Sequence, residues 1–144
     1  MPPAFPPDKK ELIEALLEQP VLARLATANP KTGQPHLVPV WFLWDGQSIW
    51  ISAFSSTRKA RDLTRNPLCA VLIEPEKAGD LQAVLFEGPA ELIEQPRDQV
   101  SVMALRIYTR YMGEDGVQAP EPQSWAFDPE NLLVKLTPSH IYAW

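Results

Sequence analysis

Two turn sequences in the first third of the chain constrain its fold most strongly. The first, residues 29–33 (Asn-Pro-Lys-Thr-Gly), separates residues 21–28 from residues 35–44, and the second, Asp45-Gly46, separates the latter from residues 48–53. The three flanking segments are rich in apolar, β-branched or aromatic residues, as strands are. Connections this short join antiparallel neighbours, because a parallel crossover needs a dozen residues or more. The sequence therefore predicts an antiparallel sheet and disfavours a doubly wound parallel fold.

The rest of the chain adds further strands and three helices without a regular alternation of the two. Apolar residues at helical spacing predict helices over about residues 9–19 (with Asp8 as N-cap), from near Thr57 to Asn66-Pro67, and from Pro96 to Gly113. Further strands are expected over residues 68–74, 81–94 (broken at Gly88-Pro89), 132–136 and 140–144, with a loop over residues 114–123. This pattern predicts one domain over residues 1–144, mainly β with inserted helices, in which an antiparallel sheet closes on itself.

Charge and cysteine content exclude several classes of function. The formal net charge is −5, from 18 acidic and 13 basic residues, which argues against nucleic acid as a partner. With Cys69 as the only cysteine and only two histidines, an intrachain disulfide and a cysteine-rich zinc site are excluded, and we expect no metal. Cys69 lies in an apolar run, so we expect a buried structural thiol. Without a signal peptide or a membrane-length apolar run, we expect a cytoplasmic protein that has no membrane partner.

The segment between the third strand and the second helix concentrates hydroxyls and cations at a helix start. It reads Ser55-Ser56-Thr57-Arg58-Lys59. The free N–H groups and positive dipole end of a helix N-terminus attract phosphate, and Arg58 and Lys59 would add a forked donor and a point charge. The alternative is an N-cap at Ser56 or Thr57 followed by solvated cations. The residues therefore leave open a phosphate-binding helix start and a purely structural one.

Several short motifs, none specific alone, occur in an informative order and spacing. They are Arg24-Leu-Ala-Thr27, Gly33-Gln-Pro-His36-Leu-Val-Pro-Val-Trp-Phe42, Asp45-Gly46, Ser55 to Ala60, Asn66-Pro67, and the closing run Val134-Lys-Leu-Thr-Pro-Ser-His-Ile-Tyr-Ala-Trp144. In this order they resemble the flavin-binding split-barrel family related to pyridoxamine 5′-phosphate oxidase.

The resemblance implies an antiparallel split β-barrel homodimer that binds flavin mononucleotide (FMN), or the related deazaflavin coenzyme F-420, at the subunit interface. By this resemblance Thr57, Arg58 and Lys59 hold the cofactor phosphate, with Ser55 and Ser56 available for further contacts. The strand that runs along the ring system corresponds to Val38, Pro39, Val40 and Trp41, flanked by Ser52 and Ala53. An apolar wall of this kind suits a flat redox-active ring.

Other residues keep two interpretations each. Arg24 either reaches the cofactor or forms an ion pair between strands, and His36 either contacts substrate or lies at a strand edge. Trp144 either stacks near the ring from the partner subunit or ends a packed strand. Met103 and the tyrosines Tyr108 and Tyr111 are expected to pack in the core or at an interface. No residue stands out as a catalytic acid or base, and the sequence leaves open whether residues 114–123 form a lid.

The function expected from these features is a flavin-dependent oxidoreductase that transfers hydride between FMN and a small organic substrate. The alternatives are a deazaflavin-dependent reductase and a non-enzymatic flavin or haem binder on the same fold. A purely structural dimerisation module would leave the basic helix start unexplained. Pyridoxamine phosphate oxidases carry an arginine-rich C-terminal segment, whereas the sequence here closes on Ser139-His-Ile-Tyr-Ala-Trp144, so we expect a different substrate.

Overall fold

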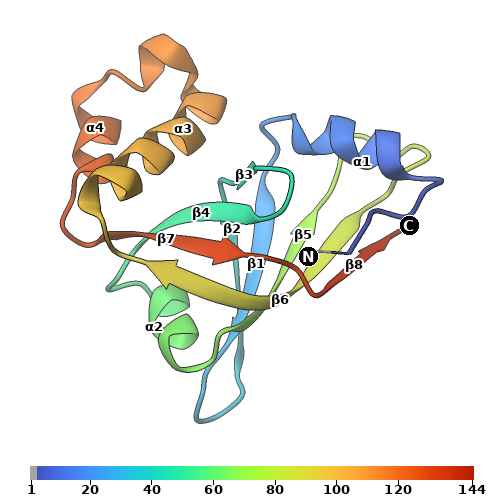
Figure 1. Ribbon diagram of the computed structural model, residues 1–144, viewed down its shortest axis with the longest axis horizontal. Helices are drawn as coiled ribbons and strands as arrows, with labels where there is room; N and C mark the ends of the chain where they lie inside the picture. Colours follow the sequence, from blue (N-terminus) through green and yellow to red (C-terminus); the bar gives the residue numbers. More distant parts are fainter. Residues whose placement is uncertain (1–2) are drawn as a thin grey trace.

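The computed structural model describes residues 3–144 and shows a strongly curled antiparallel sheet with helices around it (Figure 1). Within these residues the elements follow in the order α1 (Lys10–Leu17), β1 (Ala23–Ala28), β2 (Pro35–Val40), β3 (Leu43–Trp44), β4 (Ile49–Phe54), α2 (Arg58–Arg65), β5 (Leu68–Ile73), β6 (Val84–Ile93), α3 (Arg97–Gly116), α4 (Pro120–Ala126), β7 (Asn131–Leu136) and β8 (His140–Ala143).

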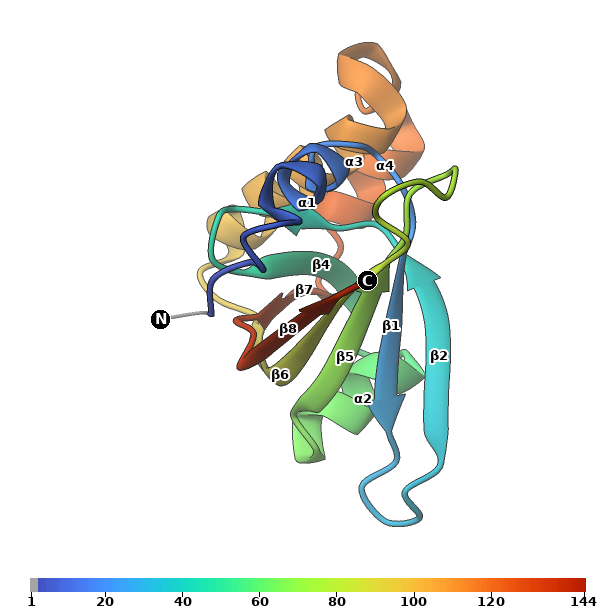
Figure 2. The ribbon, with the colours of Figure 1, turned by 90° about the vertical axis from the view of Figure 1, so that its right-hand side faces the viewer.

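All strand pairs are antiparallel, in the order β2-β1-β5-β6-β7-β4-β3, with β8 paired to β6. The predicted hairpins β1–β2 and β3–β4 are both present, in registers that place Ala23 opposite Val40 and Leu43 opposite Trp50. Figure 2 shows the curled sheet with α1, α3 and α4 at its upper end and α2 beside its lower part. The structure thus confirms the predicted split-barrel fold.

β6 belongs to both halves of the barrel. Its first part pairs with β5 and β8, and its second part, from Ala90, pairs with β7. The predicted break at Gly88-Pro89 is therefore wrong: the strand continues, and it exchanges partners at this point. Gly88 is required here because a Cβ would lie 2.9 Å from the backbone nitrogen of Ser139.

Two groups of buried side chains form the core. The larger fills the barrel and includes Phe42, Phe86 and the inner face of α1, whose Ile13, Leu16 and Leu17 are buried. The smaller lies between α3, α4 and the neighbouring strands, and α3 contributes Val100, Ala104, Ile107 and Tyr108 to it. Because the sheet packs on both groups, the position of α3 relative to β4 is fixed.

Three local expectations are corrected by the structure. The N-cap of α1 is Lys9, not Asp8, and no side chain caps that helix. The expected strand over residues 35–44 is divided into β2 and β3, because the Phe42 N–H leaves the ladder and donates to the Tyr111 hydroxyl at 3.1 Å.

The third correction concerns residues 114–123, which were expected to form a loop. The preceding helix was predicted to end at Gly113; this residue adopts a φ of +78° and interrupts α3, but another turn follows to Gly116, and Pro120 then begins α4. Proline is well suited to a helix start because its missing N–H needs no acceptor there. Val117 and Pro122 are buried, so this segment is packed and largely helical. No helix within residues 3–144 combines the length and apolar character that crossing a bilayer requires.

Candidate functional site

The site begins where β4 ends and α2 starts. Thr57 is the N-cap of α2; its N–H and its hydroxyl both donate to the Phe54 carbonyl oxygen, at 3.0 and 2.7 Å. Arg61 N donates to Thr57 O at 3.0 Å and closes the first turn of the helix. The amides of residues 58–60 precede this bond, as the first amides of any helix do. The start of α2 therefore offers N–H groups and a positive dipole end to an anion.

Lys59 turns from this helix start into a groove. The groove is formed by Leu22, β2, β4, α2 and α3, has a volume of about 360 Å³, and is lined by Leu22, Pro39, Val40, Trp41, Ser52, Lys59, Ile107 and Tyr108. An adjoining hollow of about 220 Å³ shares Ser52, Lys59 and Tyr108 with it and adds Ala53, Phe54, Thr57 and Trp125. Because they share three lining residues, we treat both as one site, the Lys59 groove.

Most of the predicted site residues meet in the Lys59 groove. Its lining includes Thr57 and Lys59 from the helix start, Ser52 and Ala53 from β4, and Pro39, Val40 and Trp41 from β2 and the residue after it. Val38 does not line the groove, since it is half-buried against the barrel core. Burial lowers the pKa of Lys59, because the half-buried ammonium has lost part of its hydration.

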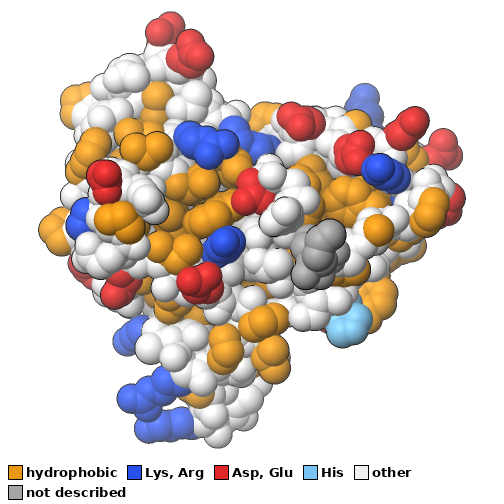
Figure 3. Space-filling model, in the orientation of Figure 1, with side chains coloured by type: hydrophobic (Ala, Val, Ile, Leu, Met, Phe, Trp, Pro, Cys, Tyr) orange, Lys and Arg blue, Asp and Glu red, His pale blue; other side chains and the backbone are white. Residues whose placement is uncertain are grey.

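Arg58 points to a different hollow from Lys59. It lies with Lys31 and Arg61 beside the β1–β2 turn, in a space of about 510 Å³. Its Nε is 3.7 Å from Oδ2 of the buried Asp62 carboxylate. Figure 3 shows Lys and Arg side chains gathered at the end of the molecule that carries α2 and this turn. The two cations predicted to act as one clamp are therefore divided between neighbouring spaces.

Ser55 and Ser56 are exposed. The Ser55 hydroxyl donates to Glu130 Oε1 at 3.4 Å, and its amide donates to the Glu130 carbonyl oxygen at 2.9 Å. Neither serine is among the residues that line the Lys59 groove. At the helix start itself, Thr57 and Lys59 supply the side chains that face the groove.

The groove also contains residues that the sequence did not predict for the cofactor site. Ile107 and Tyr108 come from α3, and Trp125 from α4. Trp41 stacks on Tyr111 with ring centroids 4.9 Å apart and planes within 5°, and it meets the Tyr108 ring edge-on at 6.0 Å. The only sequence signal for Tyr108 was its place in the apolar stripe of α3, and that stripe equally fits core packing.

A polar chain leads from the groove into the protein. Ser52 Oγ lies 2.8 Å from the Tyr108 hydroxyl and 2.6 Å from Oδ1 of Asn131, which is fully buried. Nδ2 of Asn131 donates to the Ala126 carbonyl oxygen at 3.1 Å. Burial raises the pKa of Tyr108, and the hydrogen bond to Ser52 opposes that rise, so the phenol is protonated at neutral pH.

Arg24, His36 and Trp144 lie outside the groove lining. Arg24 Nη1 is 3.1 Å from Glu74 Oε1, which is the ion-pair alternative. His36 is on β2, at one end of the sheet order and opposite Thr27. The backbone of Trp144 exchanges hydrogen bonds with Ala83, while its side chain is 52% exposed.

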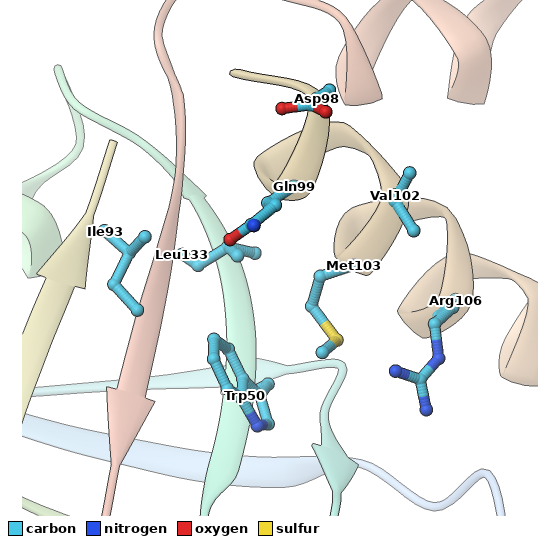
Figure 4. A pocket seen from close by; sticks show the side chains of 8 residues that line it. All are labelled: Trp50, Ile93, Asp98, Gln99, Val102, Met103, Arg106 and Leu133. Atoms are coloured by element: carbon cyan, nitrogen blue, oxygen red, sulfur yellow. The ribbon is translucent and has the colours of Figure 1, made fainter. Parts of the chain in front are cut away.

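A separate apolar hollow lies between α3 and strands β4, β6 and β7 (Figure 4). Its volume is about 320 Å³, and Trp50, Ile93 and Leu133 face Met103 across it. Asp98, Gln99 and Arg106 of α3 also line it. Met103, which was expected in the core or at an interface, thus lines a cavity that contains none of the predicted cofactor residues.

Comparison with known proteins agrees with the fold. Residues 10–144 match the family described as pyridoxamine 5′-phosphate oxidase. No curated protein sequence matches the chain at a significant level. Among solved structures, the conserved hypothetical protein Rv2991 from Mycobacterium tuberculosis is similar at 26% identity and a TM-score of 0.77, over 94% of this chain and 83% of that protein.

Two other solved structures are similar to this chain. An F420 reductase is similar at 25% identity and a TM-score of 0.72, over 90% of this chain and 94% of that protein. HutZ, the heme storage protein from Vibrio cholerae, has a TM-score of 0.72 at 17% identity, over 92% of each chain, and at that identity it shows a shared fold alone.

Proposed function

The chain belongs to the pyridoxamine 5′-phosphate oxidase family, and we propose that it binds FMN in the Lys59 groove and acts as an oxidoreductase on a small organic substrate. The observation that carries this proposal is the composition of the groove. One wall is apolar, from Pro39 to Trp41, and a half-buried cation stands at a helix start beside it. A flat ring with a phosphate tail has the complementary composition.

The residues present fit such a cofactor. Lys59 and the first amides of α2 would hold the phosphate, because they present donors at the positive end of the helix, whereas the Thr57 hydroxyl gives its proton to the Phe54 carbonyl oxygen. Pro39, Val40 and Trp41 would cover the ring and exclude water from one side. The flavin, when bound, supplies the hydride chemistry, and the protein supplies orientation and electrostatics.

The division of the two cations gives a sharp test of the phosphate assignment. FMN titrations of the apoprotein would compare Lys59→Ala with Arg58→Ala and with Arg65→Ala, an exposed control on the same helix. We expect Lys59→Ala to weaken FMN binding by about tenfold or more, since a charge-assisted hydrogen bond contributes roughly 1.5–3 kcal/mol. Arg65→Ala should leave the affinity unchanged. Equal FMN affinities for all three variants would contradict the assignment of Lys59 to the phosphate.

The second candidate cofactor is the deazaflavin F-420. It is favoured by the cations Lys31, Arg58 and Arg61, which extend the positive region beyond Lys59 and suit a longer anionic tail. The similarity to an F420 reductase supports the same reading. Parallel titrations with FMN and F-420 decide between the two. If F-420 binds more tightly than FMN, and if Arg61→Ala abolishes this preference, the result would favour a deazaflavin-dependent reductase.

A non-enzymatic carrier is the alternative from another class of function. We test this alternative because a heme storage protein has the same fold. Adding hemin to the apoprotein and recording the absorption spectrum would reveal a haem complex as a Soret band. A bound flavin that NADH, NADPH and dithionite-reduced mediators all fail to reduce would equally favour a carrier, whereas reduction by a nicotinamide donor supports an oxidoreductase.

We further propose that the protein is a homodimer with the cofactor at its interface. The Lys59 groove is open, and Leu22, which lines it, is 46% exposed, while Leu37 of β2 is 63% exposed. Pro35, Leu37 and Pro39 are all exposed at alternate positions of the edge strand β2. A second copy covering this face would bury them and close the groove. Light scattering should give twice the chain mass, and Leu37→Glu should give a monomer with weakened FMN binding.

A further inference from the structure

The hydrogen bonds at Asn131 fix the direction of the polar chain that ends at the Lys59 groove. Asn131 is fully buried, and its Nδ2 donates to the Ala126 carbonyl oxygen at 3.1 Å. A carbonyl oxygen only accepts, so the amide cannot be turned around without placing two acceptors together. Oδ1 of Asn131 therefore faces Ser52.

This orientation determines the direction in which the hydroxyl groups of Ser52 and Tyr108 donate their protons. Oδ1 can only accept, so the 2.6 Å contact is a donation from Ser52 Oγ. Serine has a single hydroxyl proton, and this bond uses it. At the 2.8 Å contact between Ser52 and Tyr108, the tyrosine must then be the donor. Each group donates away from the groove, in the order Tyr108, Ser52, Asn131.

We propose that Tyr108 is the hydrogen-bond acceptor of the Lys59 groove and selects ligands that present an N–H there. Its proton is directed to Ser52, and burial keeps it on the phenol, so the oxygen can offer only a lone pair to a ligand. The inference rests on the proposed function: among the groups of an oxidised flavin ring, the imide N–H is the only donor, and the deazaflavin ring carries the same imide. The structure thus assigns to Tyr108 the recognition of that imide edge.

Tyr111 supplies a matched comparison, one turn further along α3. Its hydroxyl donates to the Val21 carbonyl oxygen at 2.8 Å and accepts from Phe42 N at 3.1 Å, so both of its roles are filled within the protein. It stacks on Trp41 but does not line the groove. A change at Tyr111 therefore disturbs packing near the groove without removing an acceptor from it.

The test uses FMN and 3-methyl-FMN, in which a methyl group replaces the imide hydrogen. Fluorescence titrations would give the dissociation constants of both for the wild type, Tyr108→Phe and Tyr111→Phe. We expect the wild type and Tyr111→Phe to prefer FMN by about fivefold or more, the effect of one neutral hydrogen bond. In Tyr108→Phe this preference should fall by about fivefold, because FMN binding weakens while 3-methyl-FMN binding does not.

The remaining outcomes separate the two proposals. If the preference for FMN is the same in Tyr108→Phe and the wild type, either the methyl group is rejected sterically elsewhere or another residue is the acceptor. This result would overturn the role of Tyr108 but not the proposed function. An equal loss of affinity for both compounds in Tyr108→Phe would mean that Tyr108 contributes only packing. Failure of wild type to bind FMN or F-420 would overturn the proposed function and the inference together.

Discussion

The Thr27 hydroxyl donates a 2.9 Å hydrogen bond to Oδ2 of Asp62, and both residues are buried. This contact joins β1 to α2, and Arg58 Nε approaches the same carboxylate oxygen at 3.7 Å. A buried carboxylate is stable only while hydrogen bonds and charges compensate its lost hydration. The pair therefore holds the helix that begins the candidate site against the sheet.

The first prediction removes this contact. Thr27→Val keeps the shape of the side chain but leaves the Asp62 carboxylate without its buried donor. We expect the free energy of unfolding to fall by about 1–3 kcal/mol, the cost of an unsatisfied buried acceptor. Urea unfolding followed by circular dichroism measures it. Thr32→Val, in the exposed β1–β2 turn, serves as the control, and an equal loss in both variants would show that Thr27 has no special role.

Lys59 gives a prediction in which stability and binding change in opposite directions. Desolvation lowers its pKa below 10.5, so the folded apoprotein disfavours the charged ammonium that the unfolded chain carries freely. The penalty is complete below the lowered pKa, shrinks as the pH rises towards 10.5, and disappears only above 10.5, where both states are neutral. Lys59→Met should therefore stabilise the apoprotein at pH 7 by less than about 1 kcal/mol, since the side chain is only half-buried.

The measurement is thermal unfolding of wild type and Lys59→Met from pH 7 to pH 10.5. The difference between the two should shrink across the upper part of this range. FMN affinity should fall in the same variant, because the cation is lost. A variant that is less stable than the wild type at pH 7 would show that Lys59 already has a compensating partner within the protein.

The division between Arg58 and Lys59 illustrates how far the sequence could define the site. The helix start and its hydroxyls were readable from the order of residue types, and the structure has a helix beginning at Arg58 as expected. Successive side chains on a helix point about 100° apart, so two neighbouring cations rarely face one groove. Helical geometry alone could have separated them. Which of the two faces the groove depends on β2 and α3, which are distant in sequence.

The hairpins could be predicted because their turns are local, whereas the partners of β6 and the role of Tyr108 could not. Gly88-Pro89 has the composition of a strand break, yet pairing continues there because β5, β7 and β8 supply partners from remote segments. Tyr108 belongs to an apolar helical stripe, and such a stripe does not reveal which of its members ends beside a cavity. In both cases the deciding contacts are long-range.

Cys69 yields a prediction about reactivity. Burial raises the pKa of its thiol to about 12, so at pH 8 almost none of the reactive thiolate is present. The native protein should therefore react with Ellman's reagent only on the time scale of unfolding, and fully and at once in 6 M guanidinium chloride. Rapid reaction of the native protein would show that β5 opens locally.

Gly88 carries the last prediction, which tests the exchange of partners along β6. A methyl group at this position would lie 2.9 Å from Ser139 N, which itself donates to Glu87 O at 2.8 Å, and 3.2 Å from Thr137 O. Backbone atoms cannot move aside as the end of a side chain can, so Gly88→Ala must shift the link between β7 and β8. We expect a loss of about 1–3 kcal/mol, as for other overpacked sites, measured by urea unfolding. Gly79→Ala is the matched control, because a Cβ there would meet nothing within 4 Å. If Gly88→Ala proved as stable as Gly79→Ala, the close approach of β6 to Ser139 would not be what holds β8 against the barrel.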